Sequence, residues 1–220
     1  MTPEQIFNKS GADLSAEAQR ALDGTRQQGA ANAESARAVI DRVMDRKGLT
    51  DQARQAAASR TFRQAQARAE QLVSEHIAGV ERFKQSRLDR AFGARGGDAQ
   101  SLMARRQAQQ MVTSADEDWK AMDLLKTAQQ DGDTQLAQVV AGHAYSMGWT
   151  DVVDQWNHDG AHNTAIAGLL EAQQLPDTND IGWRMGVAAE YYVDKPAVLD
   201  GLRDHEIDRL ARDDLGGEAA

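Results

Sequence analysis

The chain has 220 residues, with 25 Lys and Arg against 34 Asp and Glu, so its formal net charge is -9. It contains no Cys, which excludes disulfide bonds, thiolate nucleophiles and Cys-ligated metal centres. Because no segment approaches the roughly 18 apolar residues of a membrane span, and no signal-peptide pattern opens the chain, we expect a soluble cytoplasmic protein without membrane contact.

Alanine and glutamine are abundant, with 38 Ala and 21 Gln, whereas Pro occurs only 3 times. No proline lies between Pro3 and Pro176. β-Rich proteins mark their turns with Pro and Gly, but a proline inside a helix costs about 3 kcal/mol. The distribution predicts an all-α fold. We expect long N-terminal helices followed by a C-terminal bundle of short antiparallel helix pairs.

The N-terminal half is predicted to hold a short, a medium and a long helix. Ser15 is placed to cap a short helix over 16–23. A second helix is expected over about 31–47. Thr50 caps a long helix over about 51–92, in which apolar residues recur at helical spacing. The long helix could form a hairpin with the second helix or a coiled-coil-like contact with another copy.

In the C-terminal half, caps and glycines mark the helix ends. Ser114 and Glu117 have the spacing of a capping box ahead of Trp119. Pro196 is expected to be the first residue of the last helix. The predicted helices run over about 99–112, 115–130, 134–147, 150–159, 163–175, 180–193 and 196–213. Short helices joined by short loops pack as antiparallel neighbours, so residues 115–175 are interpreted as two helical hairpins.

Charge is distributed unevenly along the chain. Residues 1–115 hold 18 basic and 13 acidic residues, whereas residues 116–220 hold 7 basic and 21 acidic ones. Either the basic half forms an arm for an acidic surface or nucleic acid, or the two halves only have differently solvated faces that can neutralise each other. Because the basic half also carries 13 acidic residues, it forms no dense phosphate-binding patch, and we expect no nucleic-acid partner. The predicted domains are a net-basic long-helix region at 1–95, a connecting segment with a helix at 96–114, an acidic helical-hairpin domain at 115–215 and a flexible tail at 216–220.

No residue pattern predicts a catalytic, metal or cofactor site, so we expect a protein that is not an enzyme and carries no cofactor. His158 and His162 are four residues apart, but Gly160 between them favours a loop over a metal-binding helix. Asp131-Gly132-Asp133 lacks the further spacing of a calcium loop and favours a helix-ending turn.

Histidine and tryptophan side chains elsewhere favour structural roles. His143 lies in an apolar helical segment, and His76 lies beside the apolar stripe of the long helix. Three tryptophans could form a ligand cage, but in a domain poor in large residues they are better explained as core. These are Trp149, Trp156 and Trp183.

The long helix carries a candidate interaction stripe of large apolar residues: Phe62, Val73, Ile77, Val80 and Phe83. Isolated helices owe most of their stability to packing, so this stripe needs a partner surface. At roughly 1.5 Å per residue, a second helix of about 17 residues is too short to cover a helix of about 42. The rest must meet the C-terminal domain, a second copy or another protein, and we expect self-association or a partner protein.

The order of several short segments along the chain resembles the order found in a known group of proteins. Leu88-Asp89-Arg90-Ala91-Phe92-Gly93 ends the long helix; Asp131-Gly132-Asp133, Leu136-Ala137 and the run from His143 to Asp151 follow it. Over about residues 50–160 this order is similar to uncharacterised all-helical proteins encoded among the virion structural and assembly genes of actinobacterial tailed phages and prophages. The shared residues are turn and core residues, so the resemblance transfers no functional residue.

The resemblance implies a role in the virion or its assembly, with phage structural proteins or a second copy as partners. The leading hypothesis is a noncatalytic phage structural or assembly protein that acts through helix-mediated contacts, located in the cytoplasm of the producing cell or in the virion. The alternative is a cytoplasmic helical-repeat-like adaptor that binds a protein or peptide in a groove.

Overall fold

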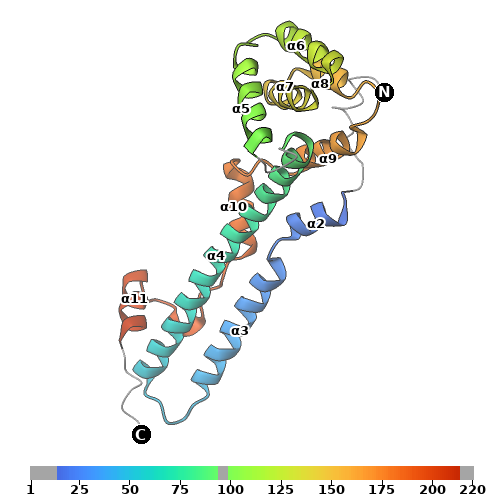
Figure 1. Cartoon of the computed structure of the whole chain (residues 1–220). Helices are drawn as coiled ribbons and strands as arrows, with labels where there is room; N and C mark the ends of the chain where they lie inside the picture. Colours follow the sequence, from blue (N-terminus) through green and yellow to red (C-terminus); the bar gives the residue numbers. More distant parts are fainter. Residues whose placement is uncertain (1–13, 94–98, 214–220) are drawn as a thin grey trace. The chain divides into compact units, whose positions relative to one another are not determined.

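The computed structural model describes residues 14–93 and 99–213, and over these residues it consists of helices and loops without a β-strand (Figure 1). This confirms the predicted all-α class. The chain divides into two compact units, each built from two separate stretches. Unit 1 comprises Met1–Gln19 and Glu81–Leu175, and unit 2 comprises Arg20–Val80 and Pro176–Ala220.

These units do not coincide with the domains expected from the sequence at 1–95 and 115–215. One boundary falls between Val80 and Glu81, inside the long helix α4, Asp51–Phe92. Another follows Leu175, because residues after Pro176 share a core with the first half of the chain rather than with 115–175. Residues 94–98, where the expected connecting segment begins, and the expected tail at 216–220 lie outside the described residues.

The N-terminal helices follow their predicted caps. The N–H of Ala18 donates to Oγ of Ser15 at 3.2 Å, at the start of α2, Ala16–Asp23. Oγ1 of Thr50 accepts from the N–H of Ala53 at 3.2 Å, at the start of α4. Helix α3, Arg26–Met44, begins at Arg26 rather than near residue 31. Within the described residues, α3 and α4 form a hairpin (Figure 1).

Unit 2 is completed by α10, Ile181–Glu190, a short 3-10 helix, Ala197–Leu199, and α11, Asp204–Arg212. The expected single helix over 196–213 is wrong, because Gly201 makes a left-handed turn (φ +82°) in the middle of it. The fully or nearly buried core of this unit comprises Ala36, Ile40, Ala58, Phe62, Ala65, Ala69, Leu72, Val187, Tyr191, Val193, Leu199 and Ile207.

Among the described residues of unit 1, five helices accompany the start of α2 and the end of α4: α5, Ala99–Thr113; α6, Asp118–Asp131; α7, Thr134–Met147; α8, Thr150–Trp156; and α9, Asn163–Gln174. Helix α7 is the central one, since its residues from Leu136 to Ala141 are buried. The predicted ends of α6 and α7 are confirmed: Gly132 and Gly148 adopt φ of +71° and +74°, where a glycine meets no Cβ penalty.

The predicted capping box at the start of α6 is wrong. Oγ of Ser114 donates to the carbonyl of Met111 at 2.6 Å and so finishes the helix before it. Helix α6 starts only at Asp118, after Glu117. Met111, at the end of α5, and Trp119, in the first turn of α6, remain largely exposed.

Candidate functional site

The predicted interaction stripe is mostly buried within the chain. Phe62, Val80 and Phe83 are 3%, 0% and 5% exposed. Val73 and Ile77 are half-buried and pack against the core of unit 2. Phe62 lies in the same core as side chains that follow Pro176. Of the three partners expected for the stripe, which were the C-terminal domain, a second copy and another protein, the C-terminal part of the same chain therefore packs against it. Self-association through this stripe stays a prediction.

Acidic residues of the C-terminal segment pair with arginines of α3 and α4 in unit 2. Nε of Arg26 lies 2.5 Å from Oε2 of Glu190. Arg63 contacts Asp204 at 3.2 Å and Asp208 at 2.8 Å. The charge difference between the two halves of the sequence is therefore partly neutralised inside the folded unit, in agreement with the second of the two interpretations.

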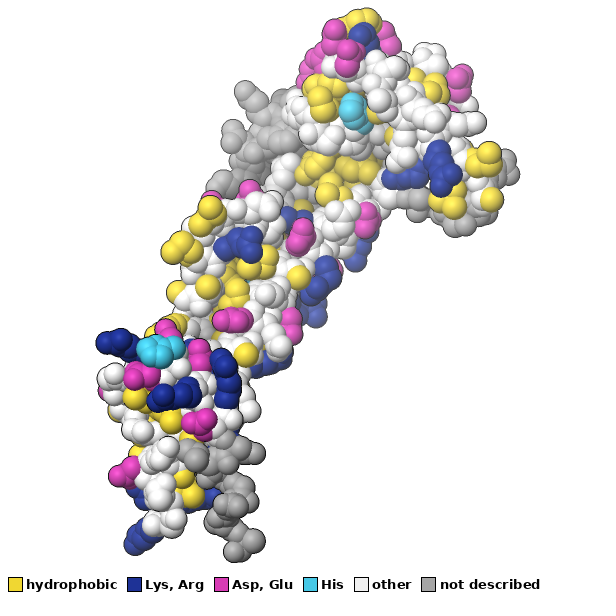
Figure 2. Space-filling model, turned by 90° about the vertical axis from the view of Figure 1, so that its left-hand side faces the viewer, with side chains coloured by type: hydrophobic (Ala, Val, Ile, Leu, Met, Phe, Trp, Pro, Cys, Tyr) yellow, Lys and Arg dark blue, Asp and Glu magenta, His cyan; other side chains and the backbone are white. Residues whose placement is uncertain are grey.

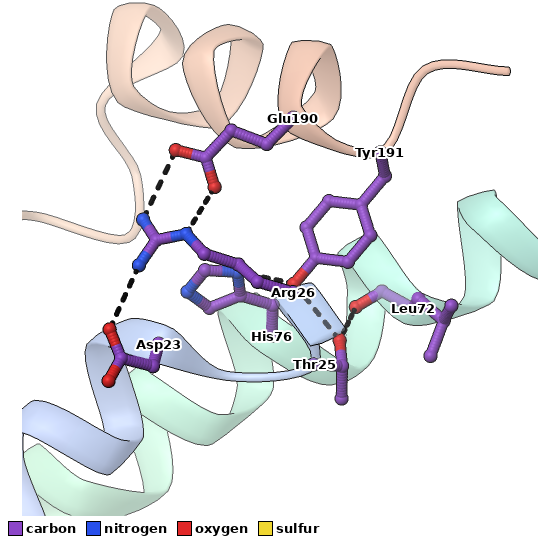
Figure 3. A network of polar contacts seen from close by, with 7 residues as sticks. All are labelled: Asp23, Thr25, Arg26, Leu72, His76, Glu190 and Tyr191. Carbon is purple, nitrogen blue, oxygen red and sulfur yellow. Dashed lines mark hydrogen bonds and ion pairs between the residues drawn. The ribbon is translucent and has the colours of Figure 1, made fainter. Parts of the chain in front are cut away.

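A buried chain of hydrogen bonds crosses unit 2 beneath α10 (Figure 3). His76 is 1% exposed, and its Nδ1 lies 2.9 Å from the hydroxyl of Tyr191. The same hydroxyl lies 3.1 Å from Oγ1 of Thr25, which donates to the Leu72 carbonyl at 2.9 Å. The chain of bonds joins the turn between α2 and α3, the middle of α4 and the end of α10.

One arrangement of the protons lets all three of these hydrogen bonds form. The single hydroxyl proton of Thr25 goes to Leu72, so Tyr191 must donate to Thr25. All three bonds then form together only if Nδ1 of His76 carries the ring proton and donates to Tyr191. Nε2 of His76 is buried and has no hydrogen bond of good geometry to another described residue, although the Leu22 carbonyl lies near enough to the ring to raise its pKa.

Two glycines allow the rings of this network to approach the backbone. A Cβ atom at Gly24 would lie 2.6 Å from Cδ2 of His76, and one at Gly29 would lie 2.5 Å from Cδ1 of Tyr191. Trp183 also meets the His76 ring edge-on, with centroids 6.1 Å apart. The ring is closed in on these sides, so the network is suited to locking helices together rather than to binding a substrate.

Burial lowers the pKa of His76 below its ordinary value, and the Leu22 carbonyl partly offsets this effect. Among the charged groups that face the ring, Arg26 also lowers the pKa, whereas Glu190 and Asp23 raise it. The ring is therefore uncharged at neutral pH.

Unit 1 has its own interior ion pair. Nη2 of Arg87 lies 3.0 Å from carboxylate oxygens of both Glu17 and Glu171, and its guanidinium lies 4.4 Å from the centre of the Phe83 ring. The N–H of Ser15 donates to Glu171 at 2.7 Å. Burial opposes ionisation of Glu171, but the bonds from Ser15 and the charge of Arg87 outweigh it, and its pKa is lowered.

A groove of about 640 Å³ lies in unit 1 among the end of α4, α5 and α7. Leu88, Phe92 and Val139 contribute apolar surface to its lining, and Arg105 and His143 contribute polar groups. This volume is in the range of small-molecule and short-peptide sites. The basic, acidic and apolar groups of the lining do not single out a reaction.

The most exposed large apolar side chains of unit 2 lie on one side of α10. Ile181, Met185 and Tyr192 are 74%, 68% and 67% exposed, on the side opposite the buried Val187 and Tyr191. Figure 2 shows apolar side chains over this helix. Ile181 and Met185 are four residues apart in the sequence, a spacing that repeats on one side of a helix and could have indicated this exposed face.

The remaining residues singled out in the sequence have structural contacts. The ring of His162 stacks on Trp156, with centroids 3.8 Å apart, and Nδ1 of His158 lies 3.1 Å from the Gln155 carbonyl. Asp133 caps α7 by accepting from the N–H of Leu136 at 2.9 Å. Among residues 14–93 and 99–213, no three His, Asp or Glu side chains are grouped so that they could hold a metal ion.

The three tryptophans considered for a cage belong to different cores. Trp149 and Trp156 pack in the core of unit 1, and Trp183 packs against that of unit 2. None of the described helices combines the length and the apolarity that crossing a membrane would take. Comparison of the chain with protein-family models, curated proteins and solved structures finds no match.

Proposed function

We propose that the chain is a noncatalytic assembly protein that binds other proteins through exposed helix faces. As the resemblance over residues 50–160 implies, we place these contacts in the virion of a tailed phage or in its assembly. The observation that carries the proposal is the outer face of α10 together with Tyr192, which follows the helix. We define this face as Ile181, Gly182, Met185, Gly186, Ala188, Ala189 and Tyr192.

None of the seven residues of this outer face is charged and all seven are exposed, while the exposed Arg184 of α10 borders the face. An exposed helix in a globular protein ordinarily turns charged and polar residues to the solvent. Clustered exposed apolar side chains, rather than isolated ones, mark sites of protein contact. The face therefore fits a helix of a partner better than it fits water.

The two glycines of this face support a close helix contact. Glycine inside a helix costs about 1 kcal/mol relative to alanine. A Cβ atom at Gly186 would meet no other atom within 4 Å, so intrachain packing does not require glycine there. Small residues beside Ile181 and Met185 leave hollows into which a partner's side chains can fit.

The test is a double variant, Ile181→Glu with Met185→Glu, measured by light scattering and by pull-down of the proteins encoded beside the gene. Both side chains are exposed and glutamate is a good helix former, so the fold should be kept. We expect association to weaken by at least about tenfold, since charge would enter an apolar contact. The matched control, Leu102→Glu with Met103→Glu, changes exposed apolar residues of α5 instead. A parent chain that neither self-associates nor binds a neighbouring gene product would refute the proposal.

The groove of unit 1 supports the second candidate, an adaptor that binds a peptide. Thr113 is exposed at the groove lining, so Thr113→Trp would fill part of the groove without entering the core. An adaptor would lose its peptide in this variant and keep it in the α10 double variant. An assembly protein acting through α10 would show the opposite pattern.

A further inference from the structure

A second surface, separate from α10, lies on the outer side of α6 in unit 1. A groove of about 420 Å³ is lined there by Met111 at the end of α5 and by Trp119, Lys120, Asp123 and Leu124 of α6. Met111 and Trp119 are 48% and 56% exposed. The groove is thus an accessible site with an aromatic ring and apolar side chains in its wall.

The Trp119 ring already receives a cation from within the chain. Nζ of Lys120 lies 5.4 Å from the centre of the ring, and the indole N–H donates to the Glu117 carboxylate. These contacts hold the ring in place while more than half of the residue stays open to solvent. A fixed, exposed indole is the aromatic surface that attracts a further cation most strongly.

Negative charge surrounds this ring. Lys120 is occupied by Asp116 at 2.5 Å and Glu117 at 3.9 Å. Asp118 and Asp123, which precede and follow Lys120 in the sequence, make no ion pair with another described residue. Figure 2 shows acidic side chains gathered around apolar ones over α6, at the top of the view. An incoming positive group therefore meets unneutralised carboxylates as well as an aromatic face.

The charge decides the class of partner. Nucleic acids and anionic membranes would be repelled, whereas a Lys- or Arg-rich protein segment would be attracted. Arg26, Arg63 and Arg87 pair with acids of their own chain. A second copy could reach the groove only with other basic residues, such as Arg105 and Arg106 of α5, so self-association of the parent that is lost in Trp119→Ala would overturn the choice of a different protein. We propose that the groove at Trp119 binds a basic segment of a different protein, with an Arg or Lys side chain over the indole and apolar side chains against Met111 and Leu124.

The test uses the full chain and a short synthetic peptide that contains Arg and Leu, with a second peptide in which every Arg is replaced by Gln. We expect the Arg peptide alone to bind, and to bind more weakly as salt is raised. Trp119→Ala should weaken its binding by roughly tenfold, a loss that corresponds to about 1.4 kcal/mol. Glu117→Gln with Asp123→Asn should weaken it similarly and removes no aromatic surface.

Two controls separate this site from general attraction and from the proposed function. Asp131→Asn with Asp151→Asn neutralises two exposed carboxylates of unit 1 elsewhere, and should leave binding unchanged. The α10 double variant should also bind the peptide as the parent does, whether or not α10 mediates assembly. Equal loss in the Asp131 and Asp151 variant, equal binding of the Gln peptide, or full binding by Trp119→Ala would each overturn the proposal.

Discussion

The hydroxyl oxygen of Tyr191 lies 2.9 Å from Nδ1 of His76, and this contact joins the end of α10 to the middle of α4. Both residues are buried, at 2% and 1% exposure. The bond therefore forms in a place where water cannot replace either partner. It holds the C-terminal segment of unit 2 onto the hairpin of α3 and α4.

We expect Tyr191→Phe to destabilise the protein by about 1–3 kcal/mol, because Nδ1 of His76 would stay buried without its hydrogen-bond partner. The neighbouring Tyr192 is 67% exposed, and Tyr192→Phe should change stability by less than about 0.5 kcal/mol. Urea unfolding of the two variants measures the difference. Equal effects at both positions would show that the buried hydroxyl does not contribute to stability.

Stability should also depend on the ionisation of His76. Since the pKa of His76 is lowered in the folded chain, the unfolded chain takes up the proton first as the pH falls. The stabilising contribution is complete above the unfolded pKa of about 6.5, and it is lost as the pH falls from there to the folded pKa.

Unfolding free energies measured at about pH 7.5 and about pH 5.5 bracket the start of this loss. His76→Asn should show a smaller decrease between these two values than the parent does. The lowered pKa values of Glu171 and Glu190 act at lower pH, below the ordinary glutamate value of about 4.3. A parent chain with unchanged stability over the interval would contradict the prediction.

Two glycine substitutions in helices should have opposite signs. At Gly29, a Cβ atom would lie 2.5 Å from the buried Tyr191 ring, so Gly29→Ala should destabilise by about 1–3 kcal/mol despite the higher helix propensity of alanine. At Gly186 the space is open, and Gly186→Ala should stabilise the free chain by about 0.5–1 kcal/mol. Thermal unfolding of both variants checks the signs. Two shifts in the same direction would disprove the packing argument at Gly29.

The ion pairs of the two units should differ in strength according to their burial. Arg87 and Glu171 have side chains that are 11% and 17% exposed, whereas Arg68 and Glu75 are 42% and 49% exposed. We expect Glu171→Gln to cost about 1–3 kcal/mol, since Arg87 would lose a partner where water reaches poorly. Glu75→Gln should cost less than about 0.5 kcal/mol. Raising the salt concentration should remove what remains of the Glu75 effect, but not that of Glu171.

The helices could be predicted well where a local signal sets their ends. Thr50 and Gly132 define helix ends by hydrogen bonds and backbone angles within a few residues, and both ends are confirmed. At Ser114 the same type of signal was wrong, because the hydroxyl had a second acceptor in the preceding turn, the Met111 carbonyl. A capping pattern does not say which of two adjacent helices its side chain completes.

The arrangement of the candidate sites could not be read from the sequence. His76 and Tyr191 are 115 positions apart in the sequence, and no local pattern predicts which distant segment packs on a given helix face. The stripe at Phe62 needed a cover, but the choice among a domain, a second copy and another protein depended on where residues after Pro176 pack. The sequence places Trp119 after a predicted cap at Ser114. Its exposure follows from the start of α6 at Asp118, which the sequence does not predict.

Each of the two units is built from two separate stretches of the chain, and the order of these stretches determines which unit can fold first during synthesis. Unit 1 receives its last residue at Leu175, while unit 2 begins at Arg20 but needs the segment after Pro176. Because a ribosome releases the chain from its N-terminus onward, unit 1 has all of its residues available before unit 2 does. During that interval Phe62 and Leu72 lack the side chains after Pro176 that bury them in the finished core. A nascent chain stalled before Pro176 would therefore expose apolar surface to chaperones, and one released after Arg212 would not.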